Sequence, residues 1–342
     1  MLDLEKSILQ WRGCADRLRD HGPSADFMSI DVLQARHELL RAVRAFFSGR
    51  DYMEVETAYL AASAPPDTHI EPLRAFVGGR GPFFFHTSPE MGMKKLLSLG
   101  CARIFQICKV FRVEELDEHH NTEFTMLEWY MPGEYRDAMQ ETEKLIRWVA
   151  ERATWRGAGY VRHEWKNYDL GLLCRDNTGI NPLLLDRDGL AQEMKIRGLV
   201  GALQGETWEE LFFKLFIQEV EPRIERDAPY FIERWPVLVS SMARRRDEQS
   251  VERFELYMKN LEIANGYTEL LDAEEQRQRF AQENEKRRSL GREPLPVDEE
   301  FLAVLPHIEA PCAGVSVGLD RLLMVLLEKQ TIDEVLVGRF RP

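Results

Sequence analysis

The sequence predicts an α+β fold, in which helices flank a mixed but mainly antiparallel sheet. Segments of alternating side chains follow one another along the chain, at residues 104–112 and 124–130 and again at 253–258 and 261–267. Helical patterns lie between these groups rather than after each strand, which is typical of antiparallel layouts. The chain has 342 residues, of which 44% are hydrophobic, enough for a packed core.

The first half of the chain predicts a short extension followed by alternating helices and strands. Residues 1–30 are a polar extension, and residues 31–342 are expected to form one catalytic domain. A helix capped by Asp31 should end at Ser48-Gly49, with these side chains recurring at helical spacing: Leu33, His37, Leu40, Val43 and Phe47. The later elements expected are strands at 52–57, 83–86, 104–112 and 124–130 and a helix at 91–99.

The second half is less regular. Residues 131–250 are mainly helical by pattern, and two strands follow at 253–258 and 261–267. Residues 272–290 form a charged helix that is expected to be a solvated face. Gly314 and Gly318 frame a predicted turn that leads into an apolar helix at 322–327.

Charge and cysteine usage exclude several classes of protein. The net charge of −13 argues against broad nucleic-acid binding, which needs clustered Lys and Arg. The five cysteines are odd in number and scattered, so they predict neither a disulfide framework nor a structural zinc site. The N-terminus lacks a basic signal region, and no run approaches the length of a membrane span. We therefore expect a cytoplasmic protein that does not bind membranes.

The hairpin between residues 111 and 130 carries more charge than a turn needs. Arg112 ends an apolar strand, where its planar guanidinium could hold a carboxylate or phosphate with two parallel hydrogen bonds. Phe124 on the returning strand offers an aromatic face for a purine base, and Arg321 could close on the base from the other side. The alternative is that these are ordinary surface charges of a hairpin.

Three carboxylates form a second candidate group. Glu255 and Glu262 lie seven residues apart on neighbouring strand-like segments, and Glu269 follows seven later. Mg²⁺ at a polyphosphate is usually held by one or two protein carboxylates and retains several waters. Spacing alone means little in an acidic chain, so this prediction depends on the wider context.

That context is a resemblance carried by four ordered motifs. Residues 111–130 (F-R-V-E to M-L-E-W-Y), 262–270 (E-I-A-N-G-Y-T-E-L) and 314–321 (G-V-S-V-G-L-D-R) resemble motif 2, the metal and substrate strands, and motif 3 of class II aminoacyl-tRNA synthetases of the lysyl type. Residues 36–57 resemble motif 1, which forms the dimer interface in that family. The resemblance implies the class II catalytic fold, a homodimer, ATP as a substrate and Mg²⁺ as its metal.

Roles for individual residues follow from the resemblance. It implies that Arg112 and Arg321 are catalytic and that Glu255 and Glu262 bind Mg²⁺. The implied ATP-binding residues are Arg112, Glu114, His120, Asn121, Phe124, Glu262, Ile263, Gly318 and Arg321. The implied substrate-binding residues are Ser88, Pro89, Glu90, Glu128, Tyr130, Asn265 and Glu269, the last as partner of a side-chain ammonium.

The length of the chain narrows the resemblance. Motif 1 starts near Gln34, which leaves no room before it for the anticodon-binding domain of a lysyl-tRNA synthetase, so stable tRNA binding is not expected. The chain is similar to the elongation factor P lysine lysyltransferase family, a truncated paralogue. That similarity implies activation of (R)-β-lysine, or lysine, to an aminoacyl-adenylate and its transfer to a lysine side chain of elongation factor P.

Some residues depart from the family pattern and leave alternatives open. Val113, Thr122 and Ala58 replace the usual Asn, Pro and Pro, and Ser316 stands where Gly or Ala is typical. A larger side chain at Ser316 would shrink the amino-acid pocket, so the amino acid itself is not fixed by the sequence. The alternatives are a lysyl-tRNA-synthetase-like ligase that charges another acceptor and a non-catalytic regulatory paralogue, although Arg112, Glu255, Glu262 and Arg321 are all present.

Overall fold

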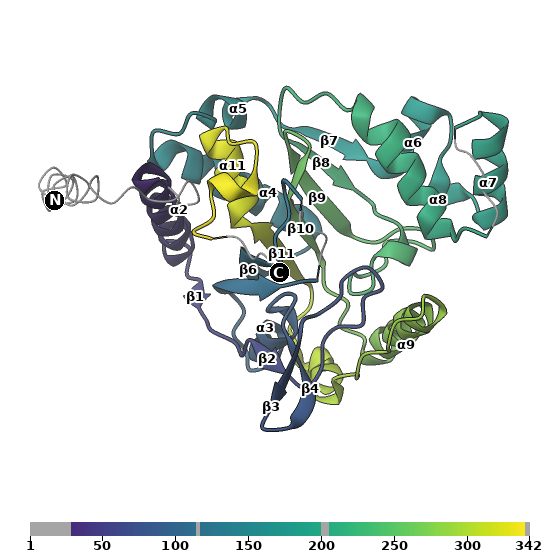
Figure 1. Ribbon diagram of the computed structural model, residues 1–342, viewed down its shortest axis with the longest axis horizontal. Coiled ribbons are helices and arrows are strands. Elements are labelled where there is room, and N and C mark those ends of the chain that lie inside the picture. The colour runs from purple at the N-terminus through teal and green to yellow at the C-terminus, as the bar shows by residue number, and fades with distance from the viewer. Residues whose placement is uncertain (1–28, 114–116, 200–204, 339–342) are drawn as a thin grey trace, which may run out of the picture.

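The computed structural model describes residues 29–113, 117–199 and 205–338, and an eight-stranded sheet runs through its centre (Figure 1). The strand order is β1-β5-β6-β11-β10-β9-β8-β7. The β1–β5 and β7–β8 pairs are parallel, and the other neighbours are antiparallel. The bounds are Met53–Glu54 (β1), Ile104–Phe111 (β5), Glu123–Pro132 (β6), Lys166–Asp169 (β7), Tyr230–Glu233 (β8), Arg253–Met258 (β9), Leu261–Thr268 (β10) and Cys312–Gly318 (β11). The predicted mixed, mainly antiparallel sheet is confirmed.

A second, three-stranded sheet stands apart from the first. Its order is β2-β4-β3, with bounds Leu60–Ala61 (β2), Arg74–Val77 (β3) and Arg80–Phe85 (β4). The β3–β4 hairpin projects from the body of the molecule (Figure 1). Its turn is Gly78-Gly79, and both residues have positive φ, which glycine adopts without strain.

Four helices pack on one face of the large sheet: α2 (Ile30–Ser48), α4 (Tyr135–Arg152), α5 (Ala158–Arg162) and α11 (Leu319–Leu327). Their apolar side chains and one set of alternate side chains from β6, β9, β10 and β11 form the main core. Trp129, Phe254 and Val317 are examples from the sheet, and all are fully buried. The opposite set of alternate side chains is thereby left for the other face.

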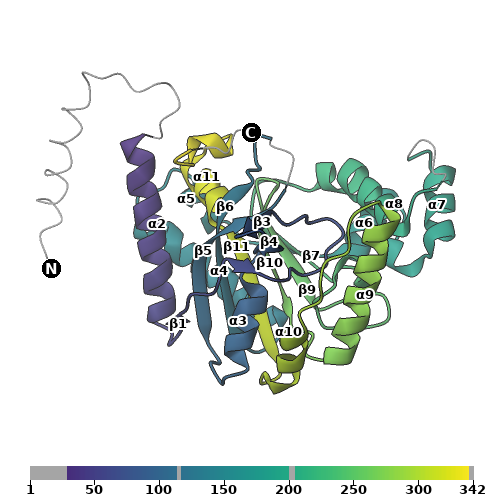
Figure 2. The ribbon, with the colours of Figure 1, turned by 60° about the horizontal axis from the view of Figure 1, so that its bottom comes forward.

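The other face is partly covered by α3 (Glu90–Leu97), α9 (Ala273–Ser289) and α10 (Glu299–Val304), which lie on the same side of the sheet in Figure 2. Met93, Phe280 and Phe301 join them to the sheet residue Ile104 in a smaller core. At the far edge, α6 (Leu170–Thr178), α7 (Arg187–Ile196), α8 (Trp208–Leu215) and a π-helical turn (Phe216–Val220) pack around β7 and β8. Within the described ranges, no helix is long and apolar enough to cross a membrane.

Two expectations about helices are wrong in detail. The cap of α2 is Ser29, whose hydroxyl accepts from the Val32 amide at 3.3 Å, and not Asp31, which lies inside the helix. Of the apolar residues in the predicted pattern, Val43 and Phe47 are fully buried, together with Leu39 and Phe46, and Leu33 is exposed. Helix α9 is more than a solvated face, because Phe280 and Arg287 on it are fully buried.

Other corrections concern strands. The strand expected at residues 52–57 is only Met53–Glu54, and β7 and β8 lie inside the region expected to be helical. The Gly314–Gly318 segment is part of strand β11 rather than a turn, and α11 begins directly after it. Of the extension, residues 1–28 lie outside the described residues, so the proposed domain division stays a prediction.

Candidate active site

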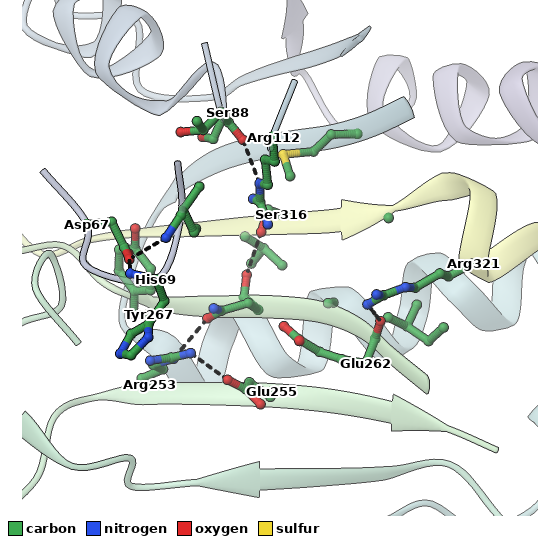
Figure 3. Close-up of a pocket in the computed structure, with 18 of the residues that line it drawn as sticks. Asp67, His69, Ser88, Arg112, Arg253, Glu255, Glu262, Tyr267, Ser316 and Arg321 are labelled. Carbon is green, nitrogen blue, oxygen red and sulfur yellow. Dashed lines mark hydrogen bonds and ion pairs between the residues drawn. The ribbon is translucent and has the colours of Figure 1, made fainter. Parts of the chain in front are cut away.

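A cavity of about 720 Å³ opens on the sheet face opposite α4 and α11 (Figure 3). Side chains from β6, β9, β10 and β11 form its floor, and α3, the β5–β6 hairpin and the loop around Asp67 contribute its walls. The predicted site residues that line it are Ser88, Glu90, Arg112, His120, Asn121, Phe124, Glu128, Tyr130, Glu255, Glu262, Ile263, Asn265, Glu269, Gly318 and Arg321. Pro89 caps α3 and does not line the cavity, and Glu114 lies outside the described residues.

Strand alternation explains why residues distant in sequence share this floor. Residues directly opposite each other on neighbouring strands point to the same face. One row across the sheet therefore runs from Glu255 through Asn265 and Ser316 to Glu128, because these residues are paired in register. A second row runs from Arg253 through Tyr267 and Gly314 to Tyr130.

A β-bulge brings Glu262 to the same face. The register shifts between Glu262, which pairs with Tyr257, and Ala264, which pairs with Leu256, so Ile263 is the extra residue. Without the bulge, Glu262 and Asn265 would point to opposite faces, since three residues separate them along the strand. The bulge therefore places both on the cavity side.

The inner half of the cavity is a buried group of charges. We call Glu90, Glu128 and Glu269 the carboxylate cluster, and Lys94 of α3 lies within it. The Lys94 ammonium contacts Glu269 and donates to Glu90 at 2.6 Å, and its side chain is fully buried. Glu128 accepts hydrogen bonds from Ser88 at 2.8 Å and from Tyr130 at 2.6 Å.

Burial dominates the electrostatics of this cluster. Burial, reinforced by the charge of Glu90, raises the pKa of Glu128 to about 7. Burial also raises the pKa of Glu269 to about 8, although Lys94 opposes the shift. For Lys94 burial acts in the opposite direction, but Glu269 and Glu90 outweigh it and its pKa lies above the ordinary value. Lys94 is therefore protonated at neutral pH, whereas burial disfavours the ionised form of Glu128 and Glu269.

The outer half of the cavity carries most of the cations. The Arg112 Nε donates to the Thr87 carbonyl at 3.1 Å, and its guanidinium carbon is 5.2 Å from the Phe124 ring centroid. Arg321 donates to the Glu262 carbonyl at 3.1 Å and contacts the His120 Nε2 at 2.6 Å. The Nδ1 of that histidine faces the Asp117 carboxylate at 2.8 Å, which fixes the ring beside Arg321.

Glu255 and Glu262 fit the chemistry of a magnesium site. Both line the cavity, and burial together with the charge of Glu262 raises the pKa of Glu255 to about 7. Oxygen ligands from one or two carboxylates are what Mg²⁺ on a polyphosphate requires. The structure pairs Glu255 with Arg253 and with the Tyr257 hydroxyl, which a metal would have to displace in part. No cluster of three or more candidate metal ligands occurs among the described residues.

The structure adds residues that the sequence prediction did not single out. Lys94 could have been found, because it follows Glu90 by one helical turn, the spacing of an ion pair. Arg253 could have been found by alternation with Glu255, with which it pairs as Figure 3 shows. Arg253 also donates to the Asn265 side chain. Asp67 and His69 line the cavity from a loop that carries no sequence signal for a site.

The sequence prediction also missed how the segment that carries Arg321 is held in place. Asp320 is almost completely buried, accepts from the Thr125 amide at 2.6 Å and pairs with Arg36 of α2. This ion pair and the hydrogen bond from Thr125 together join three of the four motifs and position Arg321, the next residue in the chain. The predicted roles of Arg112, Arg321 and the other site residues remain predictions, but most of these residues share one cavity.

Comparison with known proteins agrees with this geometry. The profile of the family "tRNA synthetases class II (D, K and N)" matches residues 26–337. The chain belongs to the class II tRNA synthetase family. The class II catalytic fold predicted from the motifs is therefore confirmed.

Curated relatives of this class II chain cover nearly all of it. An elongation factor P--(R)-beta-lysine ligase from Pseudoalteromonas translucida is 38% identical over 323 residues, which are 92% of this chain and 96% of the relative. The ligase of the same name from Pectobacterium atrosepticum is 38% identical over 92% of this chain and 95% of its own. The one from Avibacterium paragallinarum is 37% identical over 90% and 95%. The resemblance to the elongation factor P lysyltransferases is thus confirmed.

Proposed function

We propose that this protein is an ATP-dependent ligase that activates (R)-β-lysine and transfers it to a lysine side chain of elongation factor P. The observation that supports this best is the carboxylate cluster at the inner end of a cavity whose outer end carries Arg112 and Arg321. Carboxylates suit the ammonium groups of a diamino acid, and arginines suit phosphates. The names of the relatives supply the specific amino acid and acceptor.

The first step joins the amino acid to ATP. An oxygen of the substrate carboxylate attacks the α-phosphorus, the bond to the bridging oxygen breaks, and pyrophosphate leaves. Arg112 belongs to the outer half, but its contact with Thr87, the neighbour of the Ser88 that binds Glu128, brings it to the border of the inner half. It can therefore bind both the carboxylate and the α-phosphate and stabilise the charge that develops there. Arg321 and His120 would bind the outer phosphates, and Phe124 would stack on the adenine.

Mg²⁺ would be held by Glu255 and Glu262, and when bound it neutralises phosphate charge. Arg253 would then keep its contacts with Asn265, Ser240 and the Val239 carbonyl, so it can hold this wall of the cavity in place.

The second step transfers the amino acid. The ε-amine of the acceptor lysine attacks the carbonyl carbon of the adenylate, the bond to the phosphate oxygen breaks, AMP leaves, and the amine loses a proton. No side-chain nucleophile is required, so catalysis rests on positioning and on charge stabilisation.

Several finer features belong to the same proposal. We propose that the enzyme works in the cytoplasm, that it does not bind tRNA stably, and that it is a homodimer formed through α2 and β1. Exposed apolar side chains on these elements support the dimer: Ile30, Leu33 and Met53. Light scattering of the purified protein tests the dimer, and a monomeric mass at micromolar concentration would contradict it.

The central experiment separates the two steps. Pyrophosphate exchange into ATP should depend on (R)-β-lysine, or more weakly on α-lysine, and on Mg²⁺. Labelled amino acid should then appear on unmodified elongation factor P and not on tRNA. Charging of tRNA with no label on the factor would favour a tRNA ligase, and no exchange with either amino acid would favour a regulatory paralogue.

A further inference from the structure

Lys94 occupies a position that the proposed function does not use. It lies on α3 and ion-pairs with two members of the carboxylate cluster, Glu90 and Glu269, from the interior side. Its neighbour Lys95 points the other way, is partly exposed and pairs with Asp298 at 2.9 Å. Two adjacent lysines thus differ completely in environment, since the Lys94 side chain is fully buried and that of Lys95 is partly exposed.

Glu269 retains an oxygen for a ligand. Its Oε2 faces the Lys94 ammonium, while its Oε1 is buried and has no hydrogen-bond partner among residues 29–113, 117–199 and 205–338. A Cβ at Gly314 would come within 2.3 Å of that oxygen, so only glycine leaves space beside it. A buried, unsatisfied carboxylate oxygen is costly unless a donor arrives, and the donor that fits is a ligand ammonium.

The remaining titratable neighbours of the cluster carry no charge. Tyr130 of β6 and Tyr267 of β10 have pKa values raised well above the ordinary range by burial. Burial also raises the pKa of Cys312 of β11 to about 12. The charge of this half of the cavity is therefore decided by the three carboxylates and Lys94.

We propose that Lys94 is a positioning residue, a built-in counter-cation that sets the charge of the carboxylate cluster to match an amino acid with two ammonium groups. The ammonium groups of a bound ligand favour the ionised form of Glu128 and Glu269, so in the complex three carboxylates and Lys94 carry a net charge of −2. That charge balances two ligand ammonium groups once the ligand carboxylate is bound by Arg112. Lys94 also holds one oxygen of each partner, so that the other oxygen of each is left for the ligand. This inference rests on the proposed function and deepens it by assigning the charge selectivity of the amino-acid site.

The charge count predicts that removing Lys94 restores ligand affinity in a variant that lacks the charge of Glu269. A lysine with only a structural role would not give this recovery. In a Glu269→Gln variant the net charge becomes −1, and Lys94 competes with the ligand for Glu90. Replacing Lys94 as well, in Lys94→Met/Glu269→Gln, restores −2 and frees Glu90. The double variant should therefore bind (R)-β-lysine or α-lysine more tightly than Glu269→Gln alone, by about threefold or more, measured by titration calorimetry.

Two controls make the comparison specific. Lys95→Met/Glu269→Gln removes the neighbouring lysine and should bind like Glu269→Gln. The analogue 6-aminohexanoate, with one ammonium group, should gain less from the loss of Lys94 than the diamino acids do. A double variant that binds diamino acids equally or more weakly than Glu269→Gln, or a gain that is the same for both ligand classes, overturns the inference.

Further outcomes are also decisive. If Lys94→Met/Glu269→Gln does not fold, the pair Glu90→Gln and Glu90→Gln/Lys94→Met tests the same recovery on the other carboxylate. Absence of measurable binding to both members of a pair counts against the inference. Wild-type protein that binds diamino acids but neither exchanges pyrophosphate nor labels elongation factor P refutes the proposed function alone, and failure to bind any diamino acid refutes both.

Discussion

The two halves of the cavity treat charge in different ways. In the inner half, Lys94, Glu128 and Glu269 are almost completely buried, and burial shifts the pKa values of the carboxyl groups upward. In the outer half, His120 and Asp117 remain substantially exposed to water. A buried charge interacts strongly and is costly to leave unpaired, whereas an exposed charge is screened. Changes in the inner half should therefore cost more than comparable changes at the rim.

The largest effect is expected where the halves meet. Arg112→Ala should lower the rate of pyrophosphate exchange by about 3 kcal/mol of transition-state free energy, because it removes a preorganised donor to both reactants. The matched control is Lys109→Ala, which removes an exposed cation from β5, the strand that leads directly into Arg112. Unchanged exchange in Arg112→Ala would refute the role of this arginine.

A somewhat smaller loss is expected inside the cluster. Glu269→Gln should weaken amino-acid binding by about 2 kcal/mol, since a charge-assisted hydrogen bond to the ligand ammonium becomes a neutral one. The affinity for ATP should stay within about twofold, because the residue lies in the other half of the cavity. Equal losses for both substrates, measured by calorimetry, would point to a general disturbance of the fold instead.

The buried carboxyl groups also predict how stability depends on pH. The pKa of Glu269 rises from 4.5 in the unfolded chain to about 8, and that of Glu128 to about 7. Stability from these groups is complete below pH 4.5 and is lost as the pH rises through 7 to 8. With these pKa values, free protein should lose on the order of 4 kcal/mol between pH 6 and 8.5, and Glu269→Gln should lose less. Melting curves across this range test it, and parallel curves for the two proteins would contradict it.

The smallest effect is expected at the rim. His120→Ala should weaken ATP binding by only about 0.5–1 kcal/mol, because the side chain is half exposed and water replaces part of its contact. Its loss should leave amino-acid binding unchanged. If His120→Ala cost as much as Glu269→Gln, the contrast between a buried and a screened half would not hold.

Much of the fold was predictable because alternating side chains mark several of its strands. Strands β5, β6, β9 and β10 were expected close to their observed bounds, since this alternation can be recognised in the local sequence. Strands β7 and β8 were missed because they are only four residues long and lie among helices. The cap of α2 was misplaced by two residues, since Ser29 and Asp31 both have the chemistry of a cap and local sequence does not choose between them.

The site residues also divide into those that could be predicted from the sequence and those that could not. Motif residues such as Arg112, Glu128 and Arg321 were predictable because their order along the chain resembles a known family. The shared face of Glu262 and Asn265 was not, since it depends on the bulge at Ile263, and strict alternation would have separated them. The burial of Lys94 was not predictable either, because it depends on where β10 and α10 pack against α3.

The sequence by itself determined the strands β5, β6, β9 and β10, the four motifs and hence the family, because alternation and motif order are local properties of the chain. Only the tertiary structure decided which charged side chains are buried away from water. It set Lys94 against Glu269 and left Lys95 in water, and it closed the cavity floor with Gly314 beside a carboxylate oxygen. Burial depends on contacts between segments far apart in sequence, and burial decides whether a charge is screened or must find a partner.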